Sequence, residues 1–193
     1  MTVERRMALL DALNEGQPGL REIVTARTGL FEGNWDLVAY AYQQSFEALW
    51  DHAVAQTSGL AVLPLLMLWR QSVELSIKAA IEGTTGRQPP GGHRLTDLFD
   101  RLLAVRREHG AHESDDDDYT AEVRRTVAEF QELDERADRW RYPTDLKGQP
   151  HGGVNVDLDR LFQAHAMITG WCDACSIEAE QLHLYGGLGA KER

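Results

Sequence analysis

Apolar residues recur every three or four positions along most of the chain, which is the spacing of one buried face of an α-helix. Alternating runs rich in β-branched residues, which would predict strands, do not stand out anywhere in the sequence. Glycine and proline fall between the periodic segments rather than within them. The pattern therefore predicts an all-α protein.

The breaks between periodic segments divide the chain into helices. Two short helices are expected near the N-terminus, and five longer ones follow. Asn34 is a suitable N-cap for the first long helix, and Gly83 a suitable C-terminal cap for the second. The expected helices cover residues 3–13, 20–28, 34–57, 61–82, 95–108, 119–140 and 157–184.

These segments form one domain rather than several, because no linker or internal repeat separates them. We expect a single up-and-down bundle of four or five long helices over residues 33–185. Residues 1–32 would be a helical N-terminal extension, and residues 186–193 a flexible tail. The 193 residues, 42% of them hydrophobic, suffice for one sizeable core, and the composition is that of a soluble globular protein.

The net charge of the chain limits the kinds of molecule that it can bind. The formal net charge is −11, so the chain as a whole repels nucleic-acid phosphate. Between Glu113 and Asp138 the acidic residues outnumber the basic ones by 11 to 3. Any RNA or nucleotide site must therefore be a local basic patch elsewhere.

The N-terminus has no apolar stretch of the kind that directs export, and the longest apolar run, residues 60–69, is too short to span a bilayer. The chain also holds only two cysteines. We therefore expect a cytoplasmic protein with no membrane contact.

Three charged residues interrupt the most apolar predicted helix. Arg70, Glu74 and Lys78 stand four residues apart, so they share one helix face. Charges on a buried helix need partners or solvent. The stripe is either the polar wall of a binding cleft or an exposed row of ion pairs along the helix.

The same helix carries a family resemblance. The segment from Trp69 to Ala80 (WRQSVELSIKAA) resembles the signature helix of HEPN domains, with a Glu four residues before a Lys-Ala. A His-x-Leu-x-x-Leu helix start follows, here from His93 to Leu98, and an Arg-Tyr-Pro occurs late in the chain, at residues 141–143. The three motifs are in the family's order and span about residues 60–184.

The resemblance implies a helical bundle that is usually a homodimer and that binds a nucleotide or RNA, often in prokaryotic toxin–antitoxin or phage-defence systems. It implies no cofactor and no metal. A partner protein encoded nearby would also be in keeping with the family. On this interpretation the ligand-binding residues are Arg70, Glu74, Lys78, His93, Arg141 and Tyr142.

Many members of the family are metal-independent endoribonucleases with an Arg, a polar residue directly after it, and a His a few positions on. An Arg clamps phosphate, and a His titrates near neutrality. Arg160 and His165 have this spacing and are the candidate catalytic pair, although Leu161 stands at the polar position. Arg107 and His112 also have the spacing. His165 lies on the apolar stripe of its helix, where a buried core histidine is the alternative.

Two further motifs are interpreted as structural. Cys172 and Cys175 resemble a redox pair in spacing, but they fall inside a helix, and we expect small buried side chains. The aspartates 115–118 lack the spacing that wraps a cation, so no metal site is expected there. The sequence leaves open three functions: a binding module for nucleotide, RNA or protein, a ribonuclease, and a purely structural interaction module.

Overall fold

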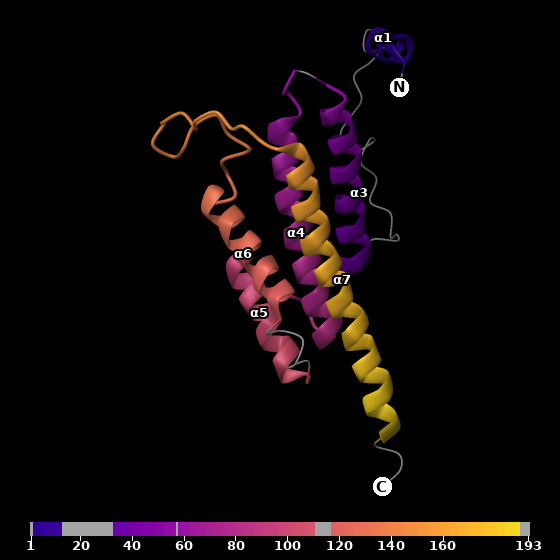
Figure 1. The fold of residues 1–193 in the computed structure, drawn as a ribbon. Helices are drawn as coiled ribbons and strands as arrows, with labels where there is room; N and C mark the ends of the chain where they lie inside the picture. The colour runs from indigo at the N-terminus through magenta and orange to yellow at the C-terminus, as the bar shows by residue number, and fades with distance from the viewer. Residues whose placement is uncertain (1, 13–32, 57, 111–116, 190–193) are drawn as a thin grey trace. The chain divides into compact units, whose positions relative to one another are not determined.

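The computed structural model describes residues 2–12, 33–56, 58–110 and 117–189 (Figure 1). Its regular structure is helical throughout these ranges, with one isolated β-bridge between Thr144 and Pro150. This confirms the predicted all-α class. The chain divides into two units, Met1–Glu32 and Gly33–Arg193, and each is described by itself.

The first unit contributes α1 (Val3–Asp11), which ends slightly before the predicted boundary. The hydroxyl of Thr2 accepts a hydrogen bond from the backbone N–H of Arg5 and so caps the helix start. None of the residues of α1 is buried. The second helix predicted in this unit, over residues 20–28, lies outside the described residues.

The second unit begins with α3 (Trp35–Val54). Asn34 is its N-cap, as predicted, and its side-chain oxygen accepts a hydrogen bond from the backbone N–H of Leu37 at 2.9 Å. The helix buries Phe46 completely.

The next helix, α4 (Val62–Thr85), is the centre of the unit and packs against α3, α5 and α7. It ends at Gly86, which has the left-handed φ of 63° that favours glycine, and not at Gly83 as predicted. Gly83 lies within the helix, where a Cβ would be 3.4 Å from the Ser176 side chain of α7. Here the glycine serves close helix approach rather than capping.

Three helices complete the unit: α5 (Leu95–Glu108), α6 (Asp118–Leu133) and α7 (Leu158–Gly189). The bounds of α5 are as predicted. Helix α6 ends seven residues before Trp140, where the helical pattern of the sequence ends, and α7 continues past the expected end at residue 184. Figure 1 shows α7 beside α4, with α5 and α6 together on one side and α3 on the other.

The core lies around α4 and is rich in aromatic side chains. Trp69 of α4 stacks on Phe130 of α6 with ring centroids 3.9 Å apart, and Phe99 of α5 lies 5.0 Å from Trp171 of α7. Burying a large apolar side chain stabilises the fold by about 1.5–3 kcal/mol. These contacts therefore hold α6 to the central helix and α5 to α7.

Two indole groups also bond to the beginning of α7. Trp50 of α3 donates its Nε1–H to the carbonyl of Leu158 at 2.7 Å, and Trp69 donates to the carbonyl of Leu161 at 3.1 Å. Both donors reach the first turns of α7 from different helices.

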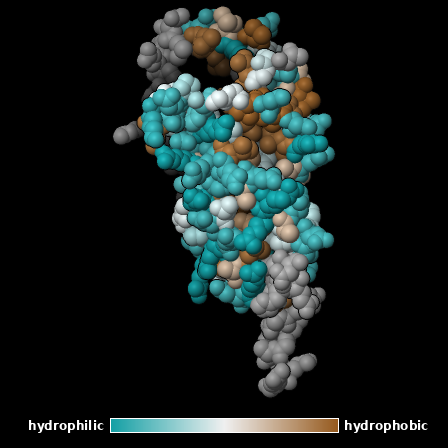
Figure 2. Space-filling view, turned by 60° about the vertical axis from the view of Figure 1, so that its left-hand side comes forward, coloured by the Kyte–Doolittle hydropathy of each residue, from teal (hydrophilic) through white to brown (hydrophobic). Residues whose placement is uncertain are grey.

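The face shown in Figure 2 is mostly hydrophilic, and its hydrophobic side chains gather in one area. Within the described residues, no helix has both the length and the apolar character needed to cross a bilayer.

Candidate functional site

The predicted charged stripe of α4 is buried, so it is not an exposed row of ion pairs. Arg70, Glu74 and Lys78 are 4%, 3% and 7% exposed. Lys78 Nζ donates to Glu74 Oε1 at 2.8 Å, and His93 Nδ1 lies 2.9 Å from the same oxygen. A buried charge is costly unless it is paired, and this carboxylate compensates Lys78.

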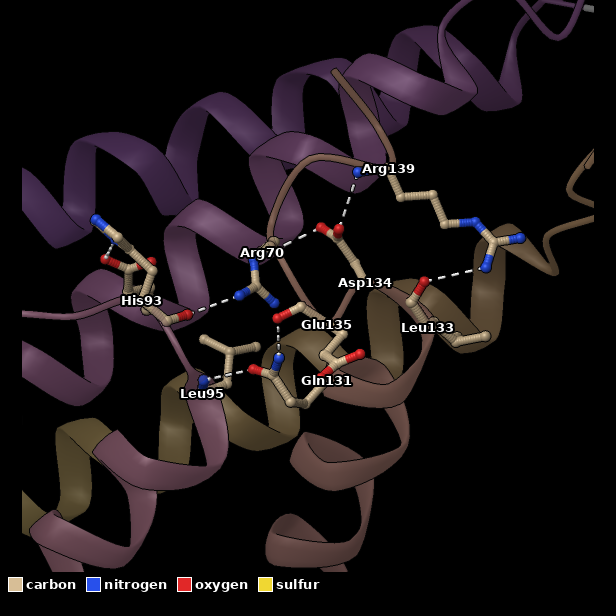
Figure 3. A network of polar contacts seen from close by, with 9 residues as sticks. Arg70, His93, Leu95, Gln131, Leu133, Asp134, Glu135 and Arg139 are labelled. Atoms are coloured by element: carbon tan, nitrogen blue, oxygen red, sulfur yellow. Dashed lines mark hydrogen bonds and ion pairs between the residues drawn. The ribbon is translucent and has the colours of Figure 1, made fainter. Parts of the chain in front are cut away.

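His93 lies just before α5, and its side chain is 72% exposed although its ring nitrogen reaches the buried Glu74. Its backbone carbonyl accepts a hydrogen bond from Arg70 Nη2 at 2.6 Å (Figure 3). The predicted residues Arg70, Glu74, Lys78 and His93 are therefore brought together by the structure.

Arg70 is the member of this group whose hydrogen bonds are incomplete. Its Nε lies 3.6 Å from Asp134 Oδ2, which is an ion pair but too long for a hydrogen bond. Within the described part of the chain, neither Nε nor Nη1 has a hydrogen-bond partner, although both atoms are buried. An unpaired buried donor costs about 1–3 kcal/mol.

Burial lowers the pKa of Arg70, while the nearby carboxylates of Asp134 and Glu74 act in the opposite direction and Arg141 adds to the lowering. The guanidinium still carries its charge, because an arginine is not deprotonated in proteins. Arg141 thus lies close enough to Arg70 for the two cations to repel each other.

The turn after α6 holds Asp134 in place. Asp134 is buried, and its Oδ1 accepts a hydrogen bond from the backbone N–H of Arg139 at 3.0 Å. Gln131 accepts from the backbone N–H of Leu95 at 2.7 Å and donates to the carbonyl of Glu135 at 2.8 Å. Figure 3 shows these contacts joining the end of α6 to the start of α5 and to Arg70.

Arg141 and Tyr142 belong to the same turn, and both side chains are exposed. Their backbone N–H groups donate to the carbonyl of Asp138. Arg141 is near the Arg70 group electrostatically, whereas no contact places the Tyr142 ring within it.

The predicted catalytic pair is not brought together. The Arg160 side chain is 83% exposed and pairs with Asp157 at 3.5 Å. His165 is 1% exposed, and its Nε2 lies 2.9 Å from the Ser72 hydroxyl. Its ring lies 4.0 Å from the Phe46 ring, centroid to centroid, and burial lowers its pKa to about 4. A neutral imidazole enclosed in this way is a core residue.

Asp134 and Gln131 are the site residues that the sequence analysis missed. Both lie between Glu113 and Asp138, the acidic stretch in which the charge balance predicted no RNA or nucleotide site. No spacing in the sequence distinguishes the buried Asp134 from its exposed neighbours, because the turn that buries it is not helical.

The cysteine pair behaves as expected. Cys172 and Cys175 are buried within α7. Residues 115 and 116 of the aspartate run lie outside the described residues. In the described ranges, no three His, Cys, Asp or Glu side chains are grouped so that they could hold a metal ion.

Comparisons with family models, with curated proteins and with solved structures gave no match to this chain.

Proposed function

We propose that the chain is a HEPN-like up-and-down bundle of four or five long helices that binds a nucleotide, with Arg70 holding a phosphate group. The observation that carries the proposal is the buried Arg70 guanidinium, which has two N–H groups without acceptors. The order of the HEPN-like motifs supports the same residues.

The chemistry of a guanidinium fits this ligand. Arginine donates two parallel hydrogen bonds to a phosphate or carboxylate, and such charge-assisted bonds are about twice as strong as neutral ones. Asp134 Oδ2 lies 3.6 Å from Arg70 Nε, which is too far for a hydrogen bond. A phosphate that replaces the Asp134 carboxylate would satisfy both donors of Arg70.

The turn that follows α6 supplies the rest of the site. Asp134 contacts Arg70 and also borders an open cavity, so a ligand reaches Arg70 when this carboxylate moves aside. Arg141 adds a second positive charge nearby. The exposed Tyr142 ring offers a surface on which a base could stack.

A mononucleotide fits the charge distribution better than RNA. Long RNA needs a basic surface that follows several phosphates, whereas this chain has a net charge of −11. The cluster presents only Arg70 and Arg141 as cations that are not fully compensated, since Lys78 is paired with Glu74. Two such charges suit one or two phosphates.

Calorimetric titration with a panel of nucleoside mono-, di- and triphosphates tests the proposal. We expect binding to the wild-type chain and at least tenfold weaker binding after Arg141→Met, which changes an exposed residue and leaves the fold intact. Arg70→Met should abolish binding, with circular dichroism to confirm that the variant folds. Arg124→Met is the matched control, because Arg124 pairs with Asp100 on the surface.

Nucleotide affinity equal in Arg141→Met and wild type, or no binding by the folded wild-type chain to any nucleotide in the panel, would overturn the proposal. The homodimer implied by the family and the cytoplasmic location expected from the sequence belong to the same proposal. Light scattering coupled to size exclusion measures the oligomeric state directly.

A further inference from the structure

Trp140 differs from the other tryptophans of the chain. The sequence holds five, and the indole N–H of four of them has an acceptor. The four acceptors are Gln88 Oε1 for Trp35, the Leu158 carbonyl for Trp50, the Leu161 carbonyl for Trp69 and Thr120 Oγ1 for Trp171. Trp140 is only 6% exposed, yet its Nε1–H has no partner in the described part of the chain.

Arg139 lies directly against this indole. Its guanidinium carbon is 5.0 Å from the centroid of the Trp140 ring, and its Nη1 donates to the carbonyl of Leu133 at 3.1 Å. These two contacts fix the guanidinium, but its buried Nε–H is left without an acceptor among the described residues. Two unpaired donors therefore belong to neighbouring side chains.

His151 adds a third unpaired nitrogen in the same region. Its backbone N–H donates to the carbonyl of Pro143, which joins the two ends of the segment 143–151. Its buried Nε2 has no partner in the described ranges. Among the described residues, three of the five buried polar side-chain atoms without partners thus lie between residues 139 and 151.

Arg139 and His151 line one open cavity of about 350 Å³. Lys147 and Arg136 line it as well. This volume holds a small ion or a small polar molecule and its water.

Carboxylates also line the cavity, and their negative charges bear on which ligand it can hold. Asp134 is engaged by Arg70 and by the Arg139 backbone, and Asp145 Oδ1 accepts from the backbone N–H groups of Lys147 and Gln149. The charge of Asp134 is therefore compensated by Arg70, and the carboxylate of Asp145 is held by backbone hydrogen bonds. The remaining acidic side chains of the cavity are the exposed Glu132 and Glu135 and the half-buried Asp138.

We propose that this cavity is a second binding site, for a small oxyanion such as phosphate or a carboxylate. The oxyanion would accept hydrogen bonds from Arg139 Nε and His151 Nε2, with Lys147 contributing charge and the Trp140 indole supporting Arg139 from behind. An oxyanion suits the site because an anion accepts from several N–H donors at once. The acidic residues nearer to solvent restrict the site to small anions.

This site is not identical to the one proposed at Arg70. Arg70 is not among the residues that line the cavity, and Asp134 stands between the two groups because it contacts Arg70 and also borders the cavity. The two proposals use the same cavity but place the anion on different donors, so each is tested with its own variants.

Nuclear magnetic resonance of the full chain labelled with ¹⁵N tests the proposal, because each tryptophan gives one indole N–H signal. Sodium phosphate, sodium acetate and sodium chloride are titrated at matched ionic strength. We expect the Trp140 signal to move with phosphate or acetate, to saturate and to stay in place with chloride. The indole signals of Trp35, Trp50, Trp69 and Trp171 should move little.

Two matched variants identify the donor. Arg139→Lys keeps the charge but removes the Nε–H group, and we expect at least fivefold weaker binding of the oxyanion. Arg136→Lys makes the same change on an exposed residue of the same cavity and should leave the affinity unchanged. Comparing phosphate with acetate shows which oxyanion the site prefers.

A Trp140 signal that follows chloride as it follows phosphate, or that does not move in the folded wild-type protein, would overturn the proposal. Equal weakening by Arg139→Lys and Arg136→Lys would do the same, since it would show that the Nε–H group of Arg139 has no specific part in binding. Arg141→Met, a change outside the lining of this cavity, should leave this titration unchanged, so failure at the nucleotide site and failure here are distinguishable.

Discussion

Glu74 Oε1 lies 2.8 Å from Lys78 Nζ inside the central helix, and both residues are buried. The same oxygen is 2.9 Å from His93 Nδ1 at the start of α5. One carboxylate thus compensates a buried lysine and also connects α4 to the loop that leads into α5. Loss of the Glu74 carboxylate would therefore affect both the buried lysine and the connection between α4 and the loop before α5.

Replacing Glu74 with Gln should destabilise the protein by about 3 kcal/mol, because it leaves Lys78 charged and buried without a counter-ion. Urea unfolding followed by circular dichroism measures this. Asp97→Asn is the control, since Asp97 pairs with Arg94 on the surface, where ion pairs contribute at most about 1 kcal/mol. Equal effects of the two changes would contradict the role given to Glu74.

His165 should make the protein less stable in acid. Its pKa is lowered to about 4 in the folded state, while an unfolded histidine titrates near its ordinary value of 6.5. Below pH 6.5 the unfolded chain therefore binds a proton that the folded chain rejects. The contribution, about 3 kcal/mol at most, is complete above pH 6.5 and is lost as the pH falls to 4.

Two measurements check this. The ¹⁵N signals of the His165 ring should show a midpoint near pH 4, and the free energy of unfolding should fall less steeply between pH 6.5 and 4 in His165→Gln than in wild type. A midpoint near 6.5 would show that the ring is open to solvent.

Gly170 should be replaceable with a gain in stability. It lies within α7, and a Cβ added there would meet no atom within 4 Å. Gly170→Ala is therefore expected to stabilise the protein by about 0.5–1 kcal/mol, because alanine loses less backbone freedom in a helix. Thermal unfolding measures the shift.

The matched control for this substitution is Gly86→Ala. Gly86 has a φ of 63° at the end of α4, a conformation that costs alanine about 1 kcal/mol or more. We expect Gly86→Ala to lower the melting temperature and Gly170→Ala to raise it. The same sign for both would contradict the backbone assignments.

Cys172 should be unreactive in the native protein. Burial, first of all, raises the pKa of its thiol well above the usual range, and the neighbouring Cys175 and Asp173 act in the same direction. Since the thiolate is the nucleophile, a disulfide reagent such as DTNB at pH 8 should react with Cys172 only after denaturation. Rapid labelling of Cys172 in the folded chain, located by mass spectrometry, would contradict its burial.

The buried His165 also predicts the outcome of a ribonuclease assay. Transfer RNA incubated with the folded protein in excess EDTA should remain intact, because a neutral imidazole enclosed by Ser72 and Phe46 cannot reach a phosphate. Cleavage that survives EDTA and is lost in His165→Ala would instead restore Arg160 and His165 as a catalytic pair.

The sequence predicted helices where a local signal marked their ends. The start of α3 follows from the side chain of Asn34, which is adjacent to it in the sequence. The Gly83 cap was wrong because the cap was decided by packing: Gly83 meets Ser176 of another helix, a contact that no local pattern contains.

The predicted extension of α6 to Trp140 was wrong for a different reason. Phe130, Ala137 and Trp140 are all buried, as their helical spacing requires. Ala137, however, has a φ of 59°, so a turn and not a helix returns Trp140 to the core. The spacing of apolar residues shows which residues are buried. Here a continued helix and a turn would both bury these residues, so the spacing does not distinguish the two backbone conformations.

Part of the candidate site could also be predicted from the spacing of residues in the sequence. The spacing of Arg70, Glu74 and Lys78 on an apolar helix identified charges that need partners. The partner of Arg70, Asp134, is 64 residues away in the sequence and becomes a neighbour only through the turn after α6. A single sequence carries no signal of that contact.

The indole hydrogen bonds of Trp50 and Trp69 to the first turns of α7 determine the axial register of that helix. An apolar stripe repeated every three or four residues tolerates sliding by a whole turn, since one apolar side chain then replaces another. Sliding α7 by a single residue, about 1.5 Å, would move the carbonyls of Leu158 and Leu161 away from both donors together. The two hydrogen bonds thus resist a displacement of α7 along its axis by a fraction of a turn.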